Sequence, residues 1–187
     1  MNLFDHFDFI APYYDQIFIR QGVPLLAEFV APDPAQRLLD VGGGTGRVAQ
    51  FFVGRVAQIC ILDPSPRMLT EGGRKGICVT RGEAERIPFG ASTFDRIIVV
   101  DAFHHMRDHR QAVREFMRVL RPGGRLVIEE PDIAHRAIKL IALAEKLLLM
   151  RSRFFPAQEL AGLFGQLGAH LRIERNGHVY WLVVDKT

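Results

Sequence analysis

The sequence has few cysteines and lacks the familiar metal-binding patterns. Its 187 residues include two cysteines, Cys60 and Cys78, and both lie in short apolar runs. We expect them to be buried core thiols and not a disulfide framework. Neither a Cys-x-x-Cys pair nor a His-Glu-x-x-His segment occurs, so we expect no metal site. This cysteine usage is typical of a reducing compartment, and we expect a cytoplasmic protein.

Long apolar runs and dense basic runs are also missing. The longest apolar stretch, 138–150, is interrupted by Lys139, Glu145 and Lys146, so no integral membrane segment is expected. The first eight residues are acidic, unlike a secretory signal. The net charge of +3 comes from scattered arginines, without the basic and aromatic clusters of a nucleic-acid groove. We therefore expect no nucleic-acid partner.

Short apolar runs alternate with longer helical patterns, which is typical of a parallel sheet covered by helices. Strands are predicted at 37–41, 57–62, 76–80, 94–100, 125–129, 171–174 and 179–184. Helices are predicted at 47–52, 66–70, 110–120, 133–150 and 156–167. Asn176-Gly177 predicts a hairpin between the last two strands. We expect one α/β domain over 1–187, a Rossmann-like, doubly wound, mostly parallel seven-stranded sheet with an antiparallel C-terminal strand and helices on both faces.

A glycine-rich turn follows the first predicted strand. It carries Asp40, Gly42, Gly43, Gly44 and Gly46. Glycines between a strand and a helix let the backbone approach a ligand closely, and helix amides would then face that ligand. A dinucleotide fingerprint would need a further glycine at position 47, which is Arg47.

Asp63 ends the second predicted strand, about twenty residues beyond the glycine turn, as expected for an acid that binds a ribose. A carboxylate there can accept hydrogen bonds from both ribose hydroxyls. The competing interpretation is a helix cap or a turn, which Pro64 and Pro66 also favour. The order of strand, glycine turn and acid favours ribose binding.

Further segments resemble a known family. They are Phe9–Asp15, Leu38–Gly46, Asp63, Gly82–Phe89, Phe94–Ile97, Asp101–Met106 and Arg118–Leu126. In this order they resemble the class I S-adenosylmethionine (SAM)-dependent methyltransferases, in particular the small-molecule group that includes the ubiquinone/menaquinone C-methyltransferases. The resemblance covers most of the chain. It is specific for the superfamily and says little about the acceptor.

The resemblance implies a role for each matching residue. Asp40, the glycine turn, Asp101 and Ala102 would hold the methionine part of SAM, Asp63 with Pro64 the ribose, and Glu83 with Ala84 the adenine. Members of the family more often carry Asp at the Glu83 position, so a direct contact of the longer side chain is open. For Asp101 the alternative is a capping role.

Methyl transfer from a sulfonium is an in-line displacement that requires positioning and no protein nucleophile. No catalytic residue is assigned, but His104, His105 and Tyr14 are candidates for a base, and a histidine pKa near 6.5 suits this task. Packing or capping is the competing interpretation for each. Tyr14 belongs to an expected N-terminal lid at 1–30, and an inserted helix at 132–155 is expected near the substrate.

The sequence thus predicts a methyltransferase that uses SAM, releases S-adenosylhomocysteine and acts on a small, apolar or aromatic molecule. A homodimer is one expected assembly. Two alternatives are a SAM-binding protein or regulatory subunit without turnover and, less favoured, an NAD-dependent oxidoreductase.

Overall fold

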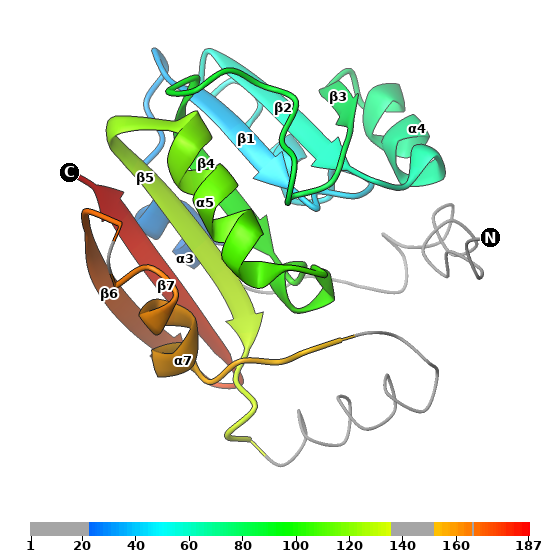
Figure 1. Ribbon diagram of the computed structural model, residues 1–187. Coiled ribbons are helices and arrows are strands. Elements are labelled where there is room, and N and C mark those ends of the chain that lie inside the picture. The colour runs from blue at the N-terminus through cyan, green and yellow to red at the C-terminus, as the bar shows by residue number, and fades with distance from the viewer. Residues whose placement is uncertain (1–22, 136–151, 166) are drawn as a thin grey trace.

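A seven-stranded sheet forms the centre of the protein (Figure 1). The computed structural model describes residues 23–135, 152–165 and 167–187. The strands are β1 (Arg37–Val41), β2 (Gln58–Asp63), β3 (Cys78–Arg81), β4 (Phe94–Val100), β5 (Leu120–Pro131), β6 (Ala169–Asn176) and β7 (Val179–Lys186). Their order is β3-β2-β1-β4-β5-β7-β6. The first five strands run parallel, whereas β7 is antiparallel to both β5 and β6. The predicted fold class is confirmed.

Helices cover both faces of the sheet. They are α3 (Val23–Val30), η2 (Ala49–Phe52), α4 (Pro66–Arg74), η3 (Phe103–His105), α5 (His109–Val119) and α7 (Ala157–Gly162). One buried cluster joins the sheet to α5 and α7, and the other joins it to α3, η2 and α4. None of the helices in the described ranges is both long and apolar enough to cross a membrane.

Alternation along the central strands produces these two cores. In β1, Leu39 belongs to the α5 side and Leu38 to the α3 side, and both are fully buried. Ile97 and Ile98 divide in the same way in β4. Burying a side chain of this size contributes roughly 1.5–3 kcal/mol. The strand ends that carry polar residues are therefore held by a rigid frame.

The predicted helix at 47–52 is wrong, because only the 3₁₀ turn η2 forms there. Phe51, Phe52 and Val53 are poor helix formers, and Val53 is already extended. Gly54, with a φ of +78°, then turns the chain toward β2. The glycine turn is therefore not followed by an α-helix whose amides point at a ligand.

Other boundaries shift by several residues. α4 extends to Arg74 and α7 ends at Gly162, earlier than predicted. The predicted hairpin forms, but its loop is Gly177 and His178, since Asn176 still pairs with Val179.

Two predicted regions fall largely outside the described residues. The inserted helix at 132–155 is described only at its ends, and residues 133–135 form a turn and bend. Of the expected lid at 1–30, only α3 (residues 23–30) is described, so Tyr14 lies outside the described residues.

The prediction for Cys78 is also wrong. Cys60 is buried in β2, whereas Cys78 is exposed in β3. β3 is a short edge strand, and none of its four residues is buried. Apolar neighbours in the sequence do not make an edge position buried.

Candidate functional site

The turn after β1 packs directly against the turn after β4. β1 and β4 are parallel neighbours, with Val41 opposite Val99, so the segments that follow them begin side by side. A Cβ on Gly42 would lie 2.5 Å from the Cβ of Ala102, and Gly42 has a φ of +70°. Glycine is required on both counts, because a side chain would clash and would disfavour this backbone. The structure thus brings together two of the predicted cofactor residues.

Neighbouring side chains leave no room for a Cβ at Gly43 or at Gly46. A Cβ on Gly43 would lie 2.6 Å from Cγ of Asp40, which is itself buried. A Cβ on Gly46 would lie 2.8 Å from Cδ1 of Ile61, and its φ is +74°. The backbone of the turn therefore closes tightly over the ends of β1 and β2.

Asp63 joins the glycine turn to the start of α4. Its Oδ2 accepts the backbone N–H of Gly44 at 3.0 Å, and its Oδ1 accepts that of Ser65 at 2.8 Å. Ser65 caps the helix by accepting the N–H of Met68 on its Oγ at 3.1 Å. Asp63 therefore has the turn role that the sequence offered as an alternative. Ribose binding is compatible with it, because a carboxylate can accept about four hydrogen bonds.

The predicted adenine segment follows β3 and starts beside Asp63. The backbone N–H of Gly82 donates to the carbonyl of Asp63 at 3.2 Å. Ala84 is buried, whereas Glu83 is exposed and its Oε1 lies 3.5 Å from Nη1 of Arg107. The Glu83 carboxylate is thus directed toward an arginine near the start of α5.

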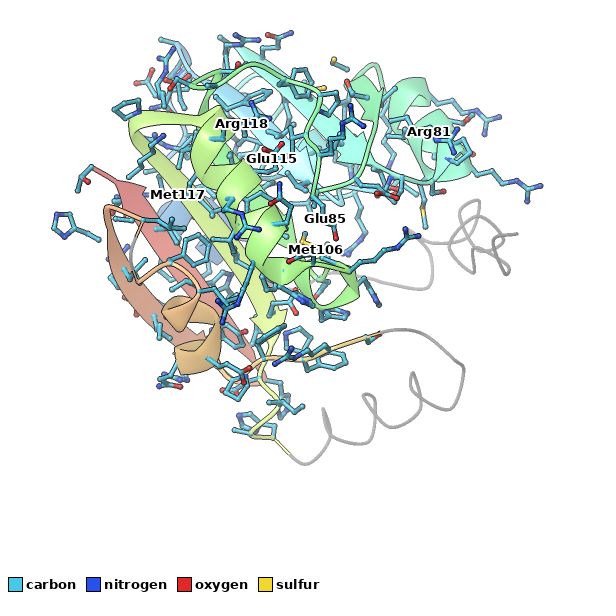
Figure 2. The ribbon with its side chains drawn as sticks, in the orientation of Figure 1. Arg81, Glu85, Met106, Glu115, Met117 and Arg118 are labelled. Carbon is cyan, nitrogen blue, oxygen red and sulfur yellow. The ribbon has the colours of Figure 1, made fainter. Side chains whose placement is uncertain are left out.

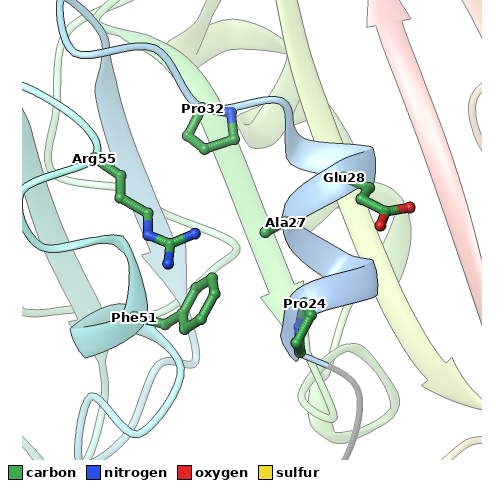
Figure 3. A pocket seen from close by; sticks show the side chains of 6 residues that line it. All are labelled: Pro24, Ala27, Glu28, Pro32, Phe51 and Arg55. Atoms are coloured by element: carbon green, nitrogen blue, oxygen red, sulfur yellow. The ribbon is translucent and has the colours of Figure 1, made fainter.

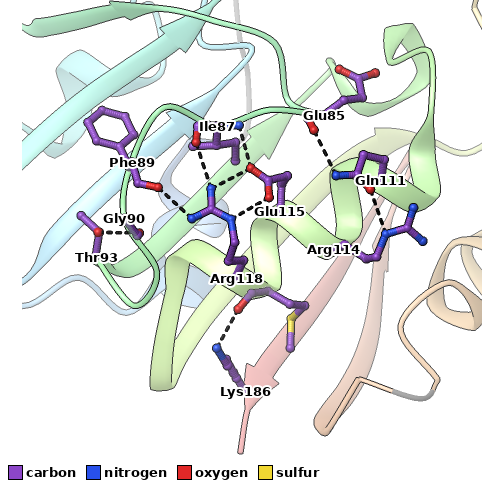
Figure 4. A network of polar contacts seen from close by, with 11 residues as sticks. Glu85, Ile87, Phe89, Gly90, Thr93, Gln111, Arg114, Glu115, Arg118 and Lys186 are labelled. Atoms are coloured by element: carbon purple, nitrogen blue, oxygen red, sulfur yellow. Dashed lines mark hydrogen bonds and ion pairs between the residues drawn. The ribbon is translucent and has the colours of Figure 1, made fainter.

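Two carboxylates, Glu115 of α5 and Glu85 of the segment itself, hold this segment beside α5 (Figures 2 and 4). Glu115 accepts the backbone N–H of Ile87 at 2.8 Å, and Arg118 donates to Glu115 and to the carbonyl of Ile87. The hydrogen bond from Arg118 lowers the pKa of Glu115 below its usual value. Glu85 makes a second link by accepting the N–H of Arg107 at 2.7 Å. The wall that these bonds fix is the one predicted to face adenine.

Asp101 follows β4 in a strained backbone conformation. Its φ is +50°, and its N–H donates to the carbonyl of Glu129 at 3.0 Å. Aspartate tolerates this left-handed region better than most residues. Strained non-glycine residues gather at functional sites, and this one stands between the glycine turn and the histidine pair.

His104 forms a buried pair with Glu130, at the end of β5. Its Nδ1 lies 2.6 Å from Oε2 of Glu130, and the two residues are 3% and 2% exposed. The other carboxylate oxygen, Oε1, accepts the N–H of Phe103 at 2.9 Å. The ring of Phe154 stacks on His104 with centroids 4.3 Å apart. A carboxylate that accepts from Nδ1 fixes the ring orientation and makes Nε2 the basic nitrogen.

His105 has a different environment from its neighbour. Its Nδ1 lies 3.2 Å from Oγ of Ser152, and its ring centroid lies 4.0 Å from that of His104. Burial, followed by the charge of His104, lowers the pKa of His105 to about 3. His105 is therefore a neutral side chain at physiological pH and a very weak base.

Sequence reasoning missed Glu130, Ser152 and Phe154. Glu130 lies 26 residues after His104, and Phe154 comes from a segment beyond residue 151. One available signal was the pair Glu129-Glu130 at the end of an apolar strand, because buried carboxylates require partners. Trp181 is the partner of Glu129, donating from Nε1 at 2.6 Å.

The residues around the glycine turn fit a nucleoside cofactor. A Cβ on Gly44 would stand 4.0 Å from Oδ2 of Asp63, so the glycine backbone and the carboxylate lie side by side, as a ribose site requires. Two cavities lie elsewhere: one of about 520 Å³ between α3 and η2, where Arg55 covers Phe51 (Figure 3), and one of about 310 Å³ beside Asp132. Within the described ranges, no three metal-ligating side chains gather, and independence of metal stays a prediction.

Comparison with known proteins identifies the domain. Residues 39–128 match the family model described as a methyltransferase domain. Residues 39–128 thus match a methyltransferase domain, and the chain is similar to SAM-dependent methyltransferases. This confirms the resemblance noted from the sequence, and the NAD-dependent alternative stays the less favoured one, as Arg47 indicates.

Several similar proteins are named as methyltransferases of quinone biosynthesis. Demethylmenaquinone methyltransferase of Renibacterium salmoninarum is 32% identical over 133 residues, covering 66% of this chain and 56% of that protein. The ubiquinone/menaquinone biosynthesis C-methyltransferase of Paracoccus denitrificans is 34% identical over 115 residues, covering 56% and 46%. The chain thus spans about half the length of these relatives.

A solved structure shares the fold over nearly the whole chain. It is a SAM-dependent methyltransferase of Thermotoga maritima, described as a possible histamine N-methyltransferase, with a TM-score of 0.80 and 22% identity. The alignment covers 97% of this chain and 98% of that one. At this identity the similarity concerns the fold and not the acceptor.

Proposed function

We propose that this protein transfers the methyl group of SAM to a small planar molecule and releases S-adenosylhomocysteine. The observation that carries the proposal is the glycine turn, packed on Ala102 and tied to the Asp63 carboxylate. When bound, SAM supplies the electrophilic methyl carbon and its leaving group. The protein has to bind, orient and exclude water.

The proposed cofactor roles follow the geometry of the two turns. The methionine part would lie against Asp40, Gly42, Gly43, Gly44, Gly46, Asp101 and Ala102. Asp63 and Pro64 would bind the ribose, and the wall at Glu83 and Ala84 would line the adenine. Arg107 competes for the Glu83 carboxylate, so we assign the backbone and Ala84 a larger part than the Glu83 side chain.

We assign the base to His104, with Glu130 as its positioning residue. A carboxylate on Nδ1 stabilises the imidazolium that forms when Nε2 takes a proton, which favours proton removal from an acceptor hydroxyl or acidic C–H. The same bond holds the ring in one tautomer. His105 is unsuitable as a base, because its pKa of about 3 leaves it with little affinity for a proton.

The stacked rings near His104 favour a planar acceptor. Phe154 stacks on His104 at 4.3 Å, and His105 adds a third ring at 4.0 Å. Aromatic pairs of this kind contribute about 0.5–1.5 kcal/mol beyond burial. The curated relatives are named for quinone biosynthesis, which agrees with a hydroxylated aromatic acceptor. We also propose that the enzyme acts in the cytoplasm.

The test is transfer of isotopically labelled methyl from SAM to a panel of simple phenols, catechols and naphthohydroquinones. We expect labelled product and stoichiometric S-adenosylhomocysteine with the wild type. His104→Gln should lower kcat by about 10²–10⁴-fold, the usual contribution of a general base, and leave the Kd for SAM nearly unchanged.

Two further variants distinguish the proposed role of His104 as a base from the effects of its neighbours Glu130 and His105. Glu130→Gln keeps an acceptor for the Phe103 N–H but removes the charge, so kcat should fall and its pH profile should shift. His105→Gln is the matched control and should retain most of the activity. Full activity of His104→Gln would refute the role of the base, and SAM binding without transfer to any acceptor would contradict turnover on this class.

A further inference from the structure

The two cysteines of the chain face each other across neighbouring strands. Cys60 in β2 and Cys78 in β3 are directly opposite in the parallel register. Their Sγ atoms lie 3.1 Å apart, although the residues are 18 positions apart in the sequence. Both are free thiols. Neighbouring strands lie about 4.8 Å apart, within the Cα separation of about 4.4–6.8 Å that disulfides span.

The two thiols differ in their access to solvent. Cys60 is 3% exposed and also lies 3.4 Å from the hydroxyl of Thr80, whereas Cys78 is exposed on the edge strand. Oxidation-sensitive cysteines combine an accessible thiol with a second thiol that can resolve the first oxidation product. Cys78 and Cys60 satisfy these two requirements in a single pair.

We propose that Cys60 and Cys78 are a modification site, a dithiol that a hydroperoxide oxidises to a disulfide linking β2 to β3. The Cys78 thiolate attacks the peroxide oxygen, the O–O bond breaks, and the Cys78 sulfenic acid and one water form. Cys60 then attacks the Cys78 sulfur while its own proton passes to the departing hydroxyl, which leaves as a second water. Two thiols and hydrogen peroxide thus become one disulfide and two waters.

The order of these steps follows from burial. Burial raises the pKa of Cys60 to about 12, with Cys78 as a further cause, so Cys60 stays protonated at neutral pH. The thiolate is the nucleophile, and the exposed Cys78 is therefore the first to react. Once Cys78 is a sulfenic acid, the 3.1 Å contact places Cys60 next to its target.

The bridge would join the edge strand to the frame of the nucleoside site. Three residues beyond the pair in each strand, Asp63 lies opposite Arg81, which Figure 2 labels at the end of β3. The next residue, Gly82, donates to the carbonyl of Asp63 at 3.2 Å. The disulfide would therefore fix β3, which leads into the segment from Glu83 onward, to β2.

The experiment uses the reduced full-length protein, freed of reductant, treated with hydrogen peroxide and then labelled with N-ethylmaleimide under denaturing conditions. Because peroxide also adds oxygen to the five methionines, maleimide labels are counted on the intact protein and oxygen is assigned from the masses of the two cysteine peptides. The wild type should lose two hydrogen atoms, take up no label and recover two labels after dithiothreitol.

The matched variants are Cys60→Ala and Cys78→Ala. Cys60→Ala should gain oxygen at Cys78, because its sulfenic acid has no resolving thiol. Cys78→Ala should keep one maleimide-reactive thiol, because Cys60 is buried. Wild-type protein that gains oxygen without losing two hydrogens, that retains both thiols after peroxide, or that forms a disulfide-linked dimer instead would overturn the proposal.

Discussion

The glycine turn (residues 40–46) and the histidine pair (His104 and His105) stand at the ends of adjacent strands but are built differently. The turn is made of backbone, and its glycines are dictated by local φ angles and close contacts such as Gly42 on Ala102. The histidine pair depends on side chains from distant segments, above all Glu130. Cofactor binding and proton transfer should therefore respond to different substitutions.

The largest effect should come from Gly42→Ala. The substitution adds a Cβ that overlaps Ala102 in a left-handed backbone, and we expect destabilisation of about 2–5 kcal/mol with loss of SAM binding. The control is Gly76→Ala, where φ is +75° but nothing lies within 4 Å of the added Cβ. It should cost about 1–2 kcal/mol, for the backbone alone.

Denaturant unfolding and SAM titration of both variants measure this difference. Equal losses of stability would show that contact with Ala102 adds nothing to the conformational requirement. If folded Gly42→Ala kept the wild-type affinity for SAM, the glycine turn would not be the part of the protein that binds the cofactor.

A smaller effect should appear in the pH dependence of stability. The pKa of His105 is about 3 in the folded protein and near 6.5 when unfolded, so below pH 6.5 the unfolded chain binds the extra proton. The stability that the neutral His105 contributes is fully present above pH 6.5 and is lost as the pH falls toward 3. His105→Gln should remove this part of the slope, and parallel curves for the two proteins from pH 7 to pH 4 would contradict it.

The smallest effect should come from Tyr180→Phe. The Tyr180 hydroxyl donates to the carbonyl of Phe155 at 3.0 Å, next to the ring that covers His104. Burial raises the pKa of Tyr180 far above its usual value, so the hydroxyl stays protonated. We expect a loss of about 1 kcal/mol in thermal unfolding and an unchanged Kd for SAM. If Tyr180→Phe lost as much SAM affinity as Gly42→Ala, the separation of cofactor binding from the histidine pair would be contradicted.

The same contrast explains which features the sequence revealed. Three features could be predicted because each depends on local pattern and spacing. They are the positions of the strands along the chain, the Gly42–Gly46 turn, and the acid Asp63 at the end of the second strand. The pairing of His104 with Glu130 could not, since nothing in the sequence states which strand end lies beside which turn. The packing of Phe154 on His104 required the fold for the same reason.

Two errors have a similar physical origin. Cys78 lies in an apolar run, but burial depends on its place at the sheet edge, which the run does not encode. The expected helix after the glycine turn became η2, because Phe51 to Gly54 favour a tight turn into β2. Local patterns predicted the elements better than their surroundings.

The most direct test of the account is calorimetric titration of the wild type and Asp63→Asn with SAM, S-adenosylhomocysteine and NAD. We predict that the wild type binds the first two and not NAD. Asp63→Asn should bind SAM about 10–100-fold more weakly, because hydrogen bonds to a charged group contribute about 1.5–3 kcal/mol. Binding of NAD alone, or equal affinity of both proteins for SAM, would contradict the assignment of this turn as the cofactor site.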